Sequence, residues 1–155
     1  MSFFPRKILL ATDGSREARL AAQAAAELAK STGSELHLVY VLPTALQPPY
    51  PHFFQRERVE AEMGRLREEA RSFLERQREQ LEAEGATVEE VHLREGRADE
   101  EIVRLAEELG AGLIVVGSRG LTGLRRALMG SVSDSVVRHA HCPVLVVRED
   151  GGGGS

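Results

Sequence analysis

The sequence has 155 residues, of which 42% are hydrophobic and 28% are charged, and its formal net charge is −4. These values are typical of one soluble globular domain, and the acidic balance argues against nucleic acid as the main partner. The single cysteine, Cys142, excludes an intrachain disulfide. No apolar run approaches the about 20 residues of a membrane-spanning helix, and the opening MSFFPRK lacks a secretory core. We therefore expect a cytoplasmic protein that binds neither nucleic acid nor membrane.

Short apolar strands alternate with helices along the chain. Strands are predicted at 7–12, 35–42, 87–93, 113–116 and 144–147. Helices are predicted from Ser15, a capping residue, to about residue 30, and at 56–84, 99–109 and 131–139. Residues 43–55 hold several prolines and aromatic residues and are read as a loop, and the last seven residues, ending in GGGGS, as a flexible tail. The prediction is a single domain over 1–148 with a tail at 149–155.

The helix at 56–84 is predicted to be amphipathic, with one face exposed to solvent. Its charged residues form i,i+4 pairs on the solvent face, at Arg65–Glu69, Arg71–Glu75 and Arg78–Glu82. The apolar stripe that would pack inward consists of Val59, Met63, Leu66, Ala70, Phe73, Leu74 and Leu81. In the strand that follows, Glu89 and Glu90 interrupt the apolar pattern, which indicates an edge strand.

Five strands alternating with four helices predict an α/β fold with an open parallel sheet and helices on both faces. With the strand order 3-2-1-4-5, the winding reverses between the first and fourth strands. Ligands of such sheets bind beyond the carboxyl ends of the strands at that reversal. Asp13 and Gly117 directly follow these two strands, so they are expected at one crevice.

A glycine pattern, Gly117-x2-Gly120-x9-Gly130-Ser131, follows the fourth strand and precedes a helix. Glycine permits positive φ and lets the backbone approach a ligand closely, and a helix N-terminus favours an anion. The pattern is therefore compatible with a phosphate site, with Arg119, Arg125 and Arg126 as counter-charges. Alternatively, the glycines only shape the turn from strand to helix.

Asp13 also has two interpretations. An Asp before Gly is a common turn residue whose side chain bonds to its own backbone. Its carboxylate is also suited to a ribose hydroxyl or to a divalent metal ion that bridges to phosphate.

The histidine and cysteine side chains, which could bind a metal ion, give weaker evidence for a functional site. His139, His141 and Cys142 lie close in sequence, but a zinc site needs three or four ligands and no second cluster is visible. His139 is better explained as a cation near a helix C-terminus. His37 and His92 lie in strand patterns and are read as packing or surface residues.

Two stretches of the sequence resemble the universal stress protein family: ILLATDGS near the start, and VVGSRGLTGLRRALMGSVSDSVVRHAHCPVLVV near the end. The glycine pattern matches the ATP-binding subgroup of that family. The resemblance implies a Rossmann-like sheet, usually paired as a homodimer through the last strand. It also implies ATP as the ligand, with or without Mg²⁺ or Mn²⁺ bridged to Asp13. The implied nucleotide-binding residues are Ala11, Thr12, Asp13, Val41 (through its backbone), Gly117, Arg119, Gly120, Gly130, Ser131, Val132 and Ser133.

Three functions compete at this point. The first is a nucleotide-dependent regulatory module of the stress response. The second is a slow ATP hydrolase, or a protein for AMP or cyclic AMP, that uses the same site. A Walker sequence is absent and neither lysine falls in the glycine loop, so at most a weak ATPase is expected and no catalytic residue is assigned. The third is an interaction protein that binds no nucleotide.

Overall fold

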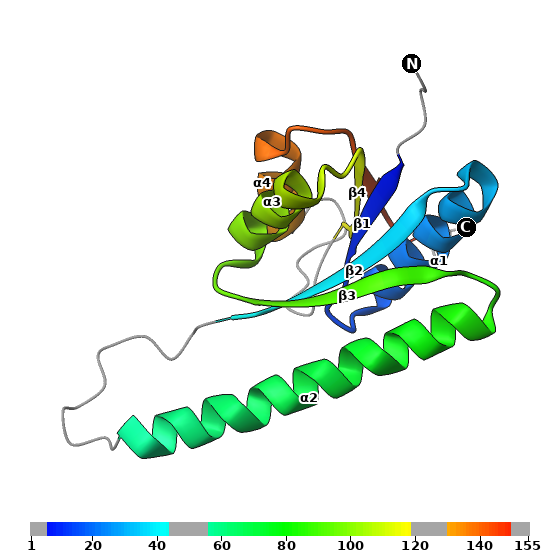
Figure 1. Ribbon diagram of the computed structural model, residues 1–155. Coiled ribbons are helices and arrows are strands. Elements are labelled where there is room, and N and C mark those ends of the chain that lie inside the picture. The colour runs from blue at the N-terminus through cyan, green and yellow to red at the C-terminus, as the bar shows by residue number, and fades with distance from the viewer. Residues whose placement is uncertain (1–5, 44–55, 119–129, 150–155) are drawn as a thin grey trace.

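The computed structural model describes residues 6–43, 56–118 and 130–149. Its elements follow the predicted alternation (Figure 1). The strands are β1 (Lys7–Ala11), β2 (Glu35–Leu42), β3 (Val88–Glu95), β4 (Leu113–Gly117) and β5 (Val144–Val147). The helices are α1 (Arg16–Thr32), α2 (Arg56–Ala83), α3 (Ala98–Leu109) and α4 (Ser131–His139). Each boundary lies within a few residues of its prediction, because helices and strands fray at their ends.

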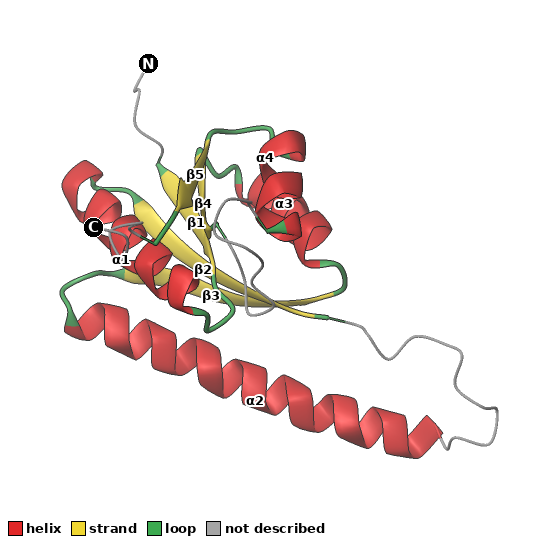
Figure 2. Ribbon diagram, turned by 180° about the vertical axis from the view of Figure 1, so that it is seen from behind, coloured by secondary structure: helices red, strands yellow, loops and turns green. Residues whose placement is uncertain are grey.

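The five described strands form one parallel sheet in the order β3-β2-β1-β4-β5, as predicted. Helices α1 and α2 cover one face, and α3 and α4 cover the other (Figure 2). The winding reverses between β1 and β4. The carboxyl ends of these two strands, at Ala11 and Gly117, are therefore neighbours in the middle of the sheet. The predicted edge strand, β3, does lie at one edge of the sheet, and β5 lies at the other.

Each face of the sheet has its own apolar core. The α1 side is built on small residues, including the buried Ala21 and Ala25, which let the helix approach the strands closely. On the other side, Ile102 and Leu105 of α3 pack against Leu9 and Val39. Strand residues therefore alternate between two buried faces, which explains why the sequence of β2 is almost continuously apolar.

The long helix α2 buries little of its surface. Of the predicted stripe only Ala70, Leu74 and Leu81 are fully buried, and the other members are partly exposed. Arg65 pairs with Glu69 at 2.6 Å and Arg78 with Glu82 at 3.8 Å, as predicted. The predicted pairing of Arg71 with Glu75 is replaced by an approach to Glu68 at 3.7 Å, one turn toward the N-terminus. Exposed pairs of this kind contribute little to stability.

Helix α1 begins and ends at residues that the sequence marks. The hydroxyl of Ser15 accepts a hydrogen bond from the Ala18 N–H at 3.1 Å, which confirms the predicted N-cap. At the other end, Gly33 adopts a left-handed conformation (φ 72°) that closes the helix. Among the helices that the structure describes, none is long and apolar enough to cross a membrane.

Candidate functional site

The carboxyl ends of β1 and β4 form one side of the candidate site. The Thr12 N–H donates to the Val39 carbonyl at 2.9 Å and thereby extends the β1–β2 pairing by one residue. Asp13 follows, and one of its carboxylate oxygens accepts a hydrogen bond from the Ser15 N–H at 2.9 Å. The turn function predicted for Asp13 is thus present. Burial and, after it, the Asp13 charge raise the pKa of Tyr40, which indicates that this carboxylate lies near the Tyr40 phenol.

Gly117, the last residue of β4, is a glycine because of close packing. A Cβ at this position would lie 2.8 Å from the Glu17 carbonyl carbon and 3.0 Å from the Ala18 nitrogen, inside the backbone of α1. Its φ is not positive, and neither is that of Gly130, at −65°. Neither glycine therefore uses the positive φ that glycine permits. At Gly117 the glycine is required by the approach of a helix to a strand.

The N-terminus of α4 is tied to the end of β4. The Gly130 N–H donates to the Ser118 carbonyl at 2.6 Å, and the buried Ser133 hydroxyl lies 2.7 Å from the same oxygen and 3.1 Å from the Gly130 carbonyl. The first helical hydrogen bond of α4 runs from the Asp134 N–H to the Gly130 carbonyl at 3.0 Å. The N–H groups of residues 131–133 thus lie before the first i→i−4 hydrogen bond of α4. Such N–H groups at a helix start favour an anion.

A buried carboxylate supports this arrangement from α1. The side chain of Glu17 is 5% exposed, and one oxygen accepts hydrogen bonds from the Ser118 hydroxyl and the Glu149 N–H, both at 2.8 Å. Glu17 therefore links α1 to the ends of β4 and β5. The sequence pattern did not predict a role for Glu17, because an acidic side chain in the first turn of a helix is normally explained by the helix dipole.

The structure brings together only part of the predicted site. The carboxyl ends of β1 and β4 bring together Ala11, Thr12, Asp13, Gly117 and Ser118. Val41 lies near the carboxyl end of the adjacent β2. Gly130, Ser131, Val132 and Ser133 form the start of α4, where Ser131 and Val132 are exposed. Arg119 and Gly120 lie outside the described residues, as do Arg125, Arg126 and most of the loop predicted at 43–55.

The predicted alternatives for His139, His141 and Cys142 are also resolved. His139 lies in the last turn of α4, where its Nδ1 is 2.9 Å from the Ser135 carbonyl, and His141 pairs with Glu107 at 2.9 Å. Burial raises the pKa of the Cys142 thiol, so the reactive thiolate is disfavoured. These three residues do not form a metal-type cluster.

A different cluster does form, contrary to the expectation that no second one exists. His37 of β2 and His92 of β3, read separately from the sequence, stack with ring centroids 5.4 Å apart, and Glu90 lies beside both. Burial lowers the pKa of His92, although the Glu90 charge opposes the shift. Only the pairing of β2 with β3 brings these residues together, because His37 and His92 are 55 positions apart in the sequence.

Several known proteins are similar to this chain. The family model described as the universal stress protein family matches residues 5–148. The universal stress protein MJ0531 of Methanocaldococcus jannaschii is 36% identical over 144 residues, which cover 93% of this chain and 82% of that protein. The solved structure of the hypothetical protein MJ0577 is 32% identical, with a TM-score of 0.79 and coverage of 94% of this chain and 97% of that one.

Two further solved structures are complexes with nucleotides. A universal stress protein in complex with cAMP is 25% identical, with a TM-score of 0.64 and coverage of 92% of this chain and 96% of that one. The universal stress protein from Archaeoglobus fulgidus in complex with dAMP is 27% identical, with a TM-score of 0.62 and coverage of 95% and 99%. From the match of the family model and the identity to its members, this chain belongs to the universal stress protein family.

Proposed function

We propose that this protein binds an adenine nucleotide, with ATP as the principal ligand, and acts as a nucleotide-dependent regulatory module. The observation that carries the proposal is the start of α4, where the N–H groups of residues 131–133 precede the helical ladder beside the ends of β1 and β4. Such a helix start attracts phosphate through its free donors and the helix dipole. The Rossmann-like topology supports the same position. The winding of the chain reverses between β1 and β4, and ligands of such sheets bind beyond the carboxyl ends of the strands at the reversal.

In this proposal the residues differ in the part of the nucleotide that they would contact. The start of α4, with Gly130 and Ser131, would hold phosphate together with Arg119 and Gly120, and Asp13 would face the ribose. The Val41 backbone would read adenine. Where Mg²⁺ or Mn²⁺ accompanies ATP, the Asp13 carboxylate would hold the ion, which would offset the negative charge of the phosphates. Asp13 suits this role because it is an oxygen ligand at the correct edge of the sheet.

The identity of the base rests on the family relationship. Members bound to cAMP and to dAMP have this fold over almost their whole length, and the glycine pattern of this chain resembles the ATP-binding subgroup. AMP and cyclic AMP are therefore the alternative ligands for the same site. Among the described residues at the carboxyl ends of β1 and β4 and at the start of α4, the side chains offer carboxylate and hydroxyl groups but no lysine. We therefore expect turnover of ATP to be slow or absent, because phosphoryl transfer needs stabilisation of developing negative charge.

Calorimetric titration of the purified chain with ATP, AMP and cyclic AMP tests the proposal directly. We expect saturable binding of ATP that Gly130→Val abolishes. Gly130 has an extended conformation (φ −65°, ψ 158°) that valine readily adopts, so this change adds a side chain to the phosphate site without backbone strain. Gly64→Val is the matched control, since a Cβ on Gly64 would meet nothing within 4 Å. A wild-type chain that binds none of the three nucleotides would leave only the interaction-protein interpretation.

We further propose that the protein is a homodimer paired through β5. This strand lies at the edge of the sheet, and Leu145 is 36% exposed on it. Exposed apolar edge strands lead to aggregation unless another strand covers them. Pairing with a second copy would satisfy the open backbone groups of β5 and cover Leu145.

A further inference from the structure

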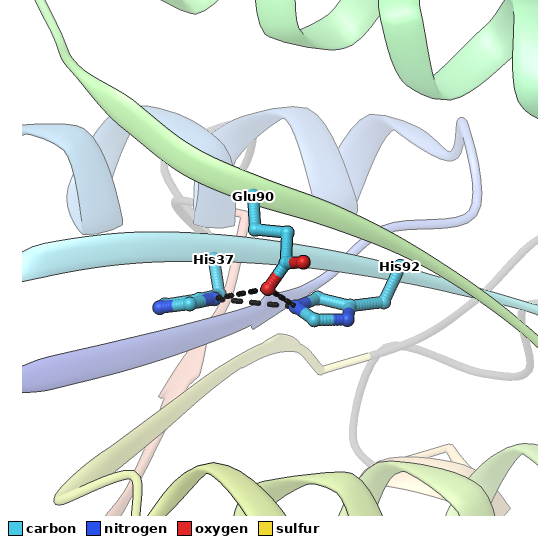
Figure 3. A group of neighbouring side chains, drawn as sticks. All are labelled: His37, Glu90 and His92. Carbon is cyan, nitrogen blue, oxygen red and sulfur yellow. Dashed lines mark hydrogen bonds and ion pairs between the residues drawn. The ribbon is translucent and has the colours of Figure 1, made fainter.

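The face of the sheet under α3 carries three side chains that converge on one point, His37 from β2 and Glu90 and His92 from β3 (Figure 3). We call them the histidine cluster. His37 is 3% exposed, His92 is partly buried, and Glu90 lies at the open side. The cluster lies in the middle of the strands, whereas the proposed nucleotide site lies at their carboxyl ends. It therefore needs an explanation of its own.

An irregularity in strand pairing creates the cluster. Leu36 pairs with Val88, but His37 pairs with Glu90, so β3 contains one extra residue at this point. Paired residues of neighbouring strands point to the same face, and a shift of one residue exchanges the two faces. The bulge therefore places Glu90 and His92 on the face of His37 instead of the opposite face. Bulges commonly redirect side chains in this way at functional sites.

The distances between the donor atoms match those around one metal ion. His37 Nδ1 lies 3.2 Å from His92 Nε2, which lies 3.4 Å from Glu90 Oε1. The third separation, from His37 Nδ1 to Glu90 Oε1, is 4.0 Å. Ligands at tetrahedral angles and zinc bond lengths would lie about 3.3–3.5 Å apart. A shift of the exposed Glu90 carboxylate toward His37 by roughly half an ångström would complete the triangle.

The second nitrogen of His37 supports the same conclusion. Within the part of the chain that the structure describes, His37 Nε2 is a buried polar atom without a hydrogen bond, and Glu35 Oε2 lies 3.6 Å from it. A metal ion on Nδ1 places the proton of neutral His37 on Nε2, facing this carboxylate. Carboxylates in that position orient and strengthen histidine ligands in many zinc sites. Glu35, 45% exposed, can close the remaining gap by a side-chain rotation.

We propose that His37, Glu90 and His92 bind a divalent transition-metal ion of the zinc type, with water as the fourth ligand. Two imidazoles and one carboxylate suit Zn²⁺, Ni²⁺ or Cu²⁺, whereas Mg²⁺ requires oxygen ligands. The ion would join edge strand β3 to β2 at the bulge, where the backbone ladder is disrupted. Without an ion, the two imidazoles form an ordinary hydrogen bond, which is the competing explanation.

Titration of the chelator-treated full chain with ZnCl₂ in a calorimeter tests the proposal. We expect one Zn²⁺ per chain, no binding of Mg²⁺, and a rise in melting temperature with zinc. His92→Ala should weaken zinc binding more than 100-fold, since loss of an outer carboxylate alone typically costs about 10–100-fold. Glu35→Gln should weaken it about 10-fold. His141→Ala removes an exposed imidazole elsewhere and should leave the affinity unchanged.

A second measurement does not depend on whether the variants fold. The ¹⁵N resonances of the imidazole nitrogens in the wild-type chain should shift on zinc addition at His37 Nδ1 and His92 Nε2, and those of His139 and His141 should not. The proposal is overturned if the wild-type chain binds no zinc. It is equally overturned if His92→Ala binds zinc as tightly as the wild type, or if His139 and His141 alone respond.

Discussion

The Ser118 hydroxyl donates a hydrogen bond to Glu17 Oε2 over 2.8 Å, and both side chains are buried. This contact joins the first turn of α1 to the residue after β4. The Ser118 carbonyl in turn accepts the Gly130 N–H, which begins α4. Ser118 therefore connects the start of α1, which is 101 positions away in the sequence, to the start of α4. The proposed phosphate site depends on this connection.

Glu17→Ala should destabilise the protein and weaken nucleotide binding. It leaves the buried Ser118 hydroxyl without its acceptor, which costs about 1–3 kcal/mol for an unsatisfied buried group. It also removes the acceptor of the part-buried Glu149 N–H. Urea denaturation would measure the loss of stability, and calorimetry with ATP the loss of affinity.

The pair can be isolated by a double-mutant cycle with Ser118→Ala. We expect the two changes to be less than additive, with a coupling energy of at least about 0.5 kcal/mol, because they remove the same hydrogen bond. Strict additivity in stability would show that the contact between Glu17 and Ser118 has no energetic weight.

Gly117→Ala should destabilise the protein by about 1–3 kcal/mol, as overpacking typically does. The new Cβ would lie 2.8 Å from backbone and side-chain carbons of Glu17, so α1 would have to move away from β4. Gly64→Ala is the control, because its Cβ meets nothing within 4 Å and alanine favours the helix by about 1 kcal/mol. Denaturation midpoints that shift in opposite directions would fit this account, whereas a neutral Gly117→Ala would contradict it.

Gly117 also shows where sequence reasoning reaches its limit. The strand order and the meeting of Asp13 with Gly117 could be predicted, because alternating strands and helices allow few right-handed arrangements. The reason for the glycine could not, since a glycine that admits a ligand and one that admits a helix look the same in sequence. His37 and His92 were missed for a related reason. Their contact depends on a bulge, and the Glu89-Glu90 interruption indicated an edge strand without revealing the extra residue.

Asp99→Asn should lower stability at neutral pH by about 1–2 kcal/mol, the range for a charge-assisted hydrogen bond near a helix N-terminus. Asp99 lies in the first turn of α3 and accepts a hydrogen bond from the Ser135 hydroxyl of α4 at 2.7 Å. Burial opposes its ionisation, but the hydrogen bonds from Ser135, Arg97 and the Glu100 backbone outweigh it and lower the pKa of Asp99.

The pH dependence of this effect has a defined sign. Because the pKa of folded Asp99 lies below its unfolded value of about 3.9, its stabilisation is complete above that value and is lost as the pH falls through the folded pKa. The stability difference between wild type and Asp99→Asn should therefore shrink below about pH 4. Glu100→Gln, an exposed change in the same turn, should show a much smaller difference at neutral pH. An Asp99→Asn difference that stayed constant from pH 7 to pH 3 would contradict the assignment.

Leu145→Lys should convert the proposed dimer to a monomer. Leu145 is exposed on edge strand β5, and a lysine in a strand–strand interface would be buried without a partner, while lysines on edge strands are a common means of preventing pairing. Light scattering coupled to size exclusion should give twice the chain mass for the wild type and the chain mass for the variant. Gln80→Lys adds the same charge to an exposed position on α2 and should remain dimeric. A wild-type chain at the monomer mass over a wide concentration range would refute pairing through β5, and a dimeric Leu145→Lys would place the interface elsewhere.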